Sequence, residues 1–157
     1  MTTRILTLVG GFALCVLLAC SDSASGQPPP PPVGGTVLWH TGYPQPYDPV
    51  GAPMPQKGGV TVFGTYAPAV GGWMVGTAEL SAAPKAGGVT KRFTLERQNN
   101  TFGTYDVGTN TMVPAKASLD GGEYNVWVTV TFGRMNPITG LPESSPVSTP
   151  IVKVVVK

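Results

Sequence analysis

The sequence predicts an all-β fold, namely a single antiparallel β-sandwich of about seven to eight strands. Its 157 residues include 21 Gly and 17 Pro but only 11% charged side chains, which is typical of a chain with many turns. Short segments rich in β-branched and aromatic side chains recur at near-regular spacing between these turns. No stretch beyond residue 19 has the apolar period of a helix.

Residues 1–19 are predicted to be an export signal. Arg4 precedes an apolar run that spans 5–19, and polar residues follow from Ser21. This order of charged, apolar and small residues is typical of a secretory signal. A helix needs about 20 apolar residues to cross the hydrocarbon core of a bilayer, so this shorter run argues against a permanent membrane span.

The apolar run ends in Leu17-Leu18-Ala19-Cys20, which resembles the lipobox of bacterial lipoproteins. The resemblance implies cleavage before Cys20 and acylation of its thiol and of the new amine. One acyl chain binds a membrane weakly, whereas two or three hold it durably. We therefore expect an extracytoplasmic protein anchored by lipid. Ser21 favours the outer membrane, because an aspartate there retains some lipoproteins at the inner one. A plain signal peptide is the alternative.

Cys20 is the only cysteine of the expected mature chain, because Cys15 leaves with the signal. A small exported domain often relies on disulfides, and this one can form none internally. The hydrophobic core must hold the fold alone. We predict three parts: a signal peptide at 1–19, the lipidated cysteine with a proline-rich linker at 20–35, and a β-sandwich domain at 36–157.

The linker contains five consecutive prolines, Pro28 to Pro32. Consecutive prolines favour an extended polyproline II helix that rises about 3.1 Å per residue. We therefore expect a tether with a stiff section between the membrane and the domain. Docking of a proline-recognising domain is the alternative.

The domain is expected to open with a strand that ends at His40, followed by a proline-rich segment up to Gln56. Trp39, His40, Tyr43 and Tyr47 lie in or beside this segment. Aromatic rings on a rigid loop can stack on sugars or on apolar groups of a partner. These four residues are candidate ligand contacts. The alternative is that the rings pack over one open end of the sandwich.

The clearest strand runs from Tyr124 to Phe132. Its even positions are all apolar and define a core face, while Thr129 and Thr131 point to the opposite face. Trp127 lies on that polar face and is a candidate ligand contact. The alternative is that the aromatic segment covers it. The other expected strands are 36–40, 60–66, 73–82, 89–97, 101–107 and 111–119.

The turn from Leu119 to Glu123, followed by Tyr124 and alternating valines, resembles the start of the sixth strand in immunoglobulin-like and fibronectin type III-like Greek-key sandwiches. The resemblance implies a tyrosine corner, in which the Tyr124 hydroxyl bonds to an upstream backbone group. The stretch from Gly103 to Val107 is similar to prealbumin-type, carboxypeptidase regulatory-like sandwiches. The subtype of sandwich therefore stays open.

Residues 133–150 contain prolines and serines, and we expect them to form a long connection. A closing strand is predicted at 151–156, with Val152, Val154 and Val156 on its core face. Lys153 falls on the other face and suits a sheet edge, where charge discourages pairing with another chain.

Charge and motifs exclude several classes of function. The formal net charge is +2, and no basic run exceeds the pair Lys91-Arg92, so nucleic acid is not an expected partner. The single histidine and the lack of a phosphate loop, nucleophile elbow or dinucleotide fingerprint argue against an enzyme, a metal site or a cofactor. We predict a lipid-anchored module that binds a protein partner or scaffolds the envelope. A carbohydrate-binding module that uses Trp39, Tyr43, Tyr47 or Trp127 is the alternative.

Overall fold

The computed structural model describes residues 33–40 and 54–157. Contacts divide the chain into two compact units, 1–30 and 31–157, and we describe the second by itself. The described residues form eleven strands and no helix, which confirms the all-β prediction. None of them lies in a helix with the length and apolarity that a membrane span requires. The predicted signal, Cys20 and most of the linker lie outside the described residues.

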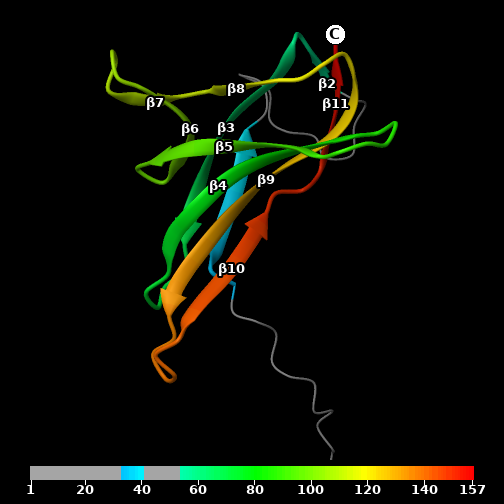
Figure 1. The fold of residues 1–157 in the computed structure, drawn as a ribbon. Coiled ribbons are helices and arrows are strands. Elements are labelled where there is room, and N and C mark those ends of the chain that lie inside the picture. The colour runs from blue at the N-terminus through cyan, green and yellow to red at the C-terminus, as the bar shows by residue number, and fades with distance from the viewer. Residues whose placement is uncertain (1–32, 41–53) are drawn as a thin grey trace, which may run out of the picture. The chain divides into compact units, whose positions relative to one another are not determined.

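The strands form two packed layers joined by one shared strand, β5 (Lys91–Gln98). The neighbour order is β1-β3-β6-β5-β4-β9-β11-β2 (Figure 1). The first layer contains β1 (Gly35–His40), β3 (Gly59–Pro68), β6 (Thr101–Asp106), β7 (Thr111–Val113) and β8 (Ala115–Ser118). The second contains β2 (Met54–Gln56), β4 (Met74–Pro84), β9 (Gly122–Met135), β10 (Pro142–Ser148) and β11 (Val152–Val156).

Strand β5 passes from one layer to the other along its length. Residues 91–95 pair with β4, whereas residues 96–98 pair with β6. Strands β4, β5 and β6 are consecutive antiparallel neighbours, and β3 lies beside β6. This is a Greek-key arrangement, as predicted.

Eight strands have five residues or more, in agreement with the predicted seven to eight. The other three, β2, β7 and β8, have 3, 3 and 4 residues. The single run predicted at 111–119 is divided into β7 and β8, which are separated by Pro114. Proline cannot donate to a sheet hydrogen bond, which explains the break.

The core lies between the two layers, and β9 contributes most to it. Its predicted core face is buried: Tyr124 is 6% exposed, and Val126, Val128, Val130 and Phe132 are 0% exposed. Val60, Val62, Tyr66 and Phe102 face them from the first layer as members of the same cluster. Full burial of one such side chain stabilises the fold by about 1.5–3 kcal/mol.

Strand β10 corrects the prediction of an irregular connection over 133–150. It pairs antiparallel with β9, with Ser145 opposite Phe132. Among the described strands it pairs with β9 alone. Pro142 and Pro146 are tolerated because an edge strand has one side on which no N–H donor is needed.

Strand β11 is also placed differently from the prediction. We expected Lys153 to mark a sheet edge, but β11 lies between β9 and the short parallel strand β2. Lys153 is exposed, and its neighbours Val152 and Val154 are buried. The three residues of β2 are too few to show an alternating pattern in a proline-rich segment, so this pairing has no local signal in the sequence.

Candidate functional site

The candidate site lies on the outer face of β4, β5 and β9. The side chains of β9 alternate between faces, so Trp127, Thr129 and Thr131 project away from the core. Trp127 stands opposite Ser81 of β4, and Ser81 stands opposite Arg92 of β5. Residues directly opposite in antiparallel strands have neighbouring side chains, so the sheet register itself assembles this group.

These side chains line a hollow of about 390 Å³. Its lining residues are Thr77, Ala78, Glu79, Ser81, Arg92, Thr94, Trp127, Thr129 and Thr131. Hydroxyl groups dominate the lining, and a half-buried indole stands among them. The hollow therefore offers one flat apolar surface surrounded by groups that can donate and accept hydrogen bonds.

One ion pair lies in the lining of the hollow, between side chains of β4 and β5. Arg92 Nη1 lies 3.4 Å from Glu79 Oε1, and the Arg92 side chain is 67% exposed. A surface pair of this length is weak and can exchange its partner for a polar ligand. Thr129 Oγ1 lies 2.7 Å from Ser148 Oγ, which extends the hydroxyl surface onto β10.

Trp39 and His40, two of the predicted ligand contacts, are neighbours on β1 but point to opposite faces of the sheet. Trp39 is buried in the core with 2% of its surface exposed, so its ring has no open face for a ligand. Its indole Nε1 has no hydrogen-bond partner among the described residues. His40, the next residue, is exposed, because neighbouring side chains of a strand point to opposite faces. Tyr43 and Tyr47 lie outside the described residues.

Tyr124, the residue of the predicted tyrosine corner, lies near the start of β9. Tyr124 is buried, as such a corner requires. Yet the hydrogen bonds between residues 54–157 include none from its hydroxyl to the upstream backbone. The bond that defines a tyrosine corner therefore stays a prediction.

Most of the residues that surround Trp127 were not predicted from the sequence. Arg92 and Thr94 could be placed on the exposed side of a strand by their alternation with Phe93 and Leu95. Glu79 and Ser81 could not be linked to Trp127, because that requires knowing that β4 pairs with both β5 and β9. Pairing of strands distant in sequence has no local signal.

A second depression, of about 640 Å³, borders the edge strand β10. Val33, Trp73, Pro146 and Val147 contribute to its lining. Trp73 is itself 6% exposed, and the Arg134 guanidinium lies 4.5 Å from its ring centroid. This depression is more apolar than the Trp127 hollow and lies along β10, which pairs with β9 alone among the described strands.

The described part of the chain contains no candidate metal centre in addition to the Trp127 hollow and the β10 depression. No group of three or more His, Cys, Asp or Glu side chains is close enough there to hold an ion.

Comparisons with known proteins identify no relative, since the chain matches no protein-family model, no curated protein and no solved structure. Function must therefore be argued from the geometry.

Proposed function

We propose that this protein is a lipid-anchored, extracytoplasmic binding module whose Trp127 hollow binds a saccharide. The observation that supports this most is a single indole surrounded by the hydroxyls of Thr94, Thr129 and Thr131 on an open sheet face. The module acts by binding and not by catalysis.

A sugar ring has the complementary chemistry. Its C–H face is apolar and stacks on an aromatic ring, and its equatorial hydroxyls both donate and accept hydrogen bonds. Stacking on Trp127 would bring those hydroxyls toward Thr129, Glu79 and Arg92. The open form of the hollow suits a unit within a glycan chain better than an enclosed small molecule.

The anchoring half of the proposal is supported by the sequence. Leu17 to Cys20 matches the lipobox pattern, and Ser21 favours the outer membrane. A proline-rich tether behind such an anchor would hold the binding domain among the glycans of the envelope.

The test is binding of cell-wall and capsular glycans to the protein, measured by calorimetry. We expect Trp127→Ala to weaken binding about tenfold or more, because truncating a central aromatic contact commonly costs upwards of 1 kcal/mol. Trp127→Phe should retain part of the affinity. Leu38→Ala is the matched control, because Leu38 is exposed on β1, a strand outside the hollow. No binding across a broad panel, or equal losses in Trp127→Ala and Leu38→Ala, would refute the saccharide site.

A protein partner is the second candidate, and β10 is the observation that favours it. An edge strand with an apolar depression beside it can accept an extended segment of another chain. Crosslinking in cells followed by affinity purification would test this candidate. A stoichiometric partner crosslinked to residues 143–148 supports it, and partners crosslinked only elsewhere contradict it.

A further inference from the structure

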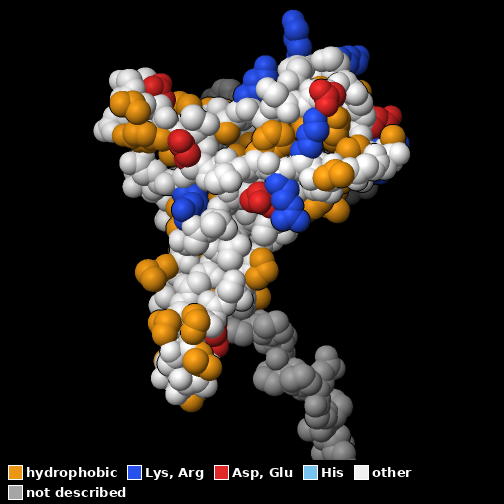
Figure 2. All heavy atoms as spheres, in the orientation of Figure 1, with side chains coloured by type: hydrophobic (Ala, Val, Ile, Leu, Met, Phe, Trp, Pro, Cys, Tyr) orange, Lys and Arg blue, Asp and Glu red, His pale blue; other side chains and the backbone are white. Residues whose placement is uncertain are grey.

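Two turns at one end of the domain, one between β3 and β4 and one between β9 and β10, expose apolar side chains. Figure 1 shows that the β3–β4 turn and the β9–β10 turn lie at the same end. Hydrophobic side chains gather there in Figure 2, while the Lys and Arg side chains seen in this view lie over the rest of the domain. We define the apolar tip as Val70, Met74, Met135, Ile138 and Leu141, which are 96%, 71%, 63%, 93% and 64% exposed.

The tip carries no charge of its own. Residues 68–74 and 135–142 contain no Asp, Glu, Lys or Arg. The nearest charged pair, Arg134 and Glu143, is joined by a bond of 2.6 Å between Nε and Oε2. The Arg134 guanidinium also lies against the Trp73 ring. Contact of this end with a low-dielectric phase would therefore leave no isolated charge.

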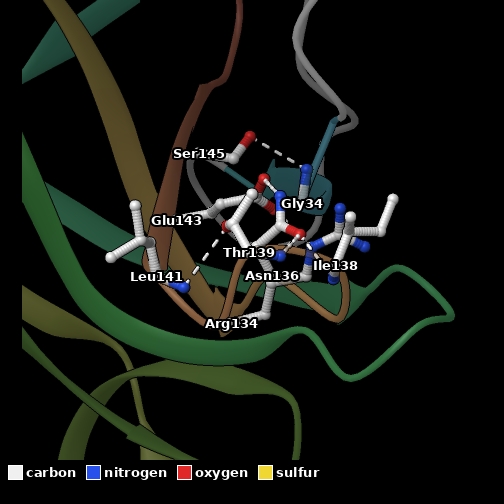
Figure 3. Close-up of polar contacts among 8 residues, drawn as sticks. All are labelled: Gly34, Arg134, Asn136, Ile138, Thr139, Leu141, Glu143 and Ser145. Carbon is white, nitrogen blue, oxygen red and sulfur yellow. Dashed lines mark hydrogen bonds and ion pairs between the residues drawn. The ribbon is translucent and has the colours of Figure 1, made fainter.

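The backbone amides of Ile138, Thr139 and Leu141 in the β9–β10 turn are all bonded within the turn (Figure 3). Asn136 Oδ1 accepts hydrogen bonds from the amides of Ile138 and Thr139, at 2.8 and 3.0 Å. The Asn136 backbone amide donates to the Leu141 carbonyl at 2.8 Å. Asn136 Nδ2 donates to Glu143. The turn is thus ordered by its own bonds, and the side chains of Ile138 and Leu141 are left to face outward.

The chain from the predicted anchor joins the domain at this same end. The Gly34 amide donates to Ser145 Oγ at 2.9 Å, and the Gly34 carbonyl accepts from the Ala69 amide at 2.8 Å. Ala69 begins the β3–β4 turn, and Ser145 belongs to β10. A side chain at Gly34 would not fit, since an added Cβ would lie 2.6 Å from Phe132 Cβ. Gly34 is therefore fixed beside both turns, by its bonds to Ala69 and Ser145.

Only residues 21–32 separate Cys20 from Val33. Even fully extended, these twelve residues reach about 40 Å. A bilayer holding acyl chains on Cys20 would therefore lie within about 40 Å of Val33, the residue before the Gly34 contacts at the tip end of the domain.

We propose that the apolar tip seats on the surface of the bilayer that holds the protein's own lipid anchor. This inference rests on the anchoring half of the proposed function and is independent of the saccharide site. The anchor supplies permanent attachment, and insertion of the tip among the headgroups fixes the orientation of the domain. The Trp127 face then stands beside the membrane in a defined direction.

The test uses an Ile138→Cys variant of the full chain, purified from membranes and labelled with an environment-sensitive fluorophore. The labelled protein is reconstituted into vesicles of phosphatidylethanolamine and phosphatidylglycerol. Val107→Cys, whose site is 82% exposed in the β6–β7 turn, is the matched control. We expect a blue shift and quenching by spin-labelled acyl chains at residue 138, and an aqueous signal without quenching at residue 107.

The number of fluorophores bound per chain shows whether the tip proposal alone has failed or the lipid anchor is absent as well. One label per chain with an aqueous signal at residue 138 overturns the tip proposal and leaves the anchor intact. Labelling of Cys20 as well means that the anchor is absent, and the tip proposal fails with it. A blue shift without lipid quenching means that the tip contacts a second copy of the chain, which also overturns the proposal.

Discussion

At the scale of single residues, the Thr149 side chain supplies a hydrogen-bond acceptor to the backbone of β9. Strand β10 ends at Ser148, and Pro150 has no amide hydrogen. Thr149 Oγ1 accepts a hydrogen bond from the Val128 amide at 3.0 Å, and the Thr149 amide donates to the Val128 carbonyl at 2.9 Å. Both residues are buried. One threonine thus continues the hydrogen bonding of β9 across the gap between β10 and β11.

We therefore expect Thr149→Val to lower the free energy of unfolding by about 1–3 kcal/mol, because the buried Val128 amide loses its acceptor. Urea unfolding measures the change. Thr129→Val is the matched control, since the Thr129 hydroxyl pairs with Ser148 on the outer face, where water can replace it. This control should stay within about 0.5 kcal/mol of the wild type. Equal effects of the two variants would contradict the assigned role of Thr149.

At the scale of elements, the β9–β10 hairpin depends on one carboxylate. Hydrogen bonds from Arg134 and then from Asn136 hold the pKa of Glu143 below its ordinary value of 4.5. A carboxyl group whose pKa is lowered by folding stabilises the folded state above the ordinary pKa. That stabilisation is lost as the pH falls through the lower pKa of the folded state.

We expect the Ile138 and Thr139 amide resonances to stay constant from neutral pH to the ordinary glutamate value and to shift only below it. NMR titration of these amides and of the Glu143 carboxyl carbon measures this. Glu143→Gln should remove the transition, because the amide does not titrate. A Glu143 midpoint at or above the ordinary value of 4.5 would disprove the role of the Arg134 and Asn136 bonds.

The elements also differ in how far the sequence could predict them. Strand β9 was predicted with its core face because five apolar residues alternate there without interruption. Strand β10 was missed because Pro142, Pro146 and its serines resemble a loop, although an edge strand accepts them. The same difference applies to the candidate site. Trp127 could be predicted from the alternation along its own strand, whereas placing Glu79 and Ser81 beside it requires knowing which strands pair.

At the scale of the whole molecule, both layers share one core. Trp39 on β1, Trp73 before β4 and Trp127 on β9 lie in different parts of the sandwich. Side chains from both layers form a single buried cluster, and β5 belongs to both layers. Residues 33–157 contain no cysteine, so packing and hydrogen bonds alone connect the layers. Neither layer can bury its inner face without the other.

We therefore expect the domain to unfold in one cooperative transition. Tryptophan fluorescence reports tertiary packing and far-ultraviolet circular dichroism reports strand content, and the two should share a midpoint in urea. Leu80→Ala removes a fully buried side chain of β4 and should cost about 2–5 kcal/mol. It should move both midpoints together, because loss of packing in the second layer exposes the inner face of the first. If the two signals separate in the variant, one layer retains structure alone, and the single shared core is not what holds the sandwich closed.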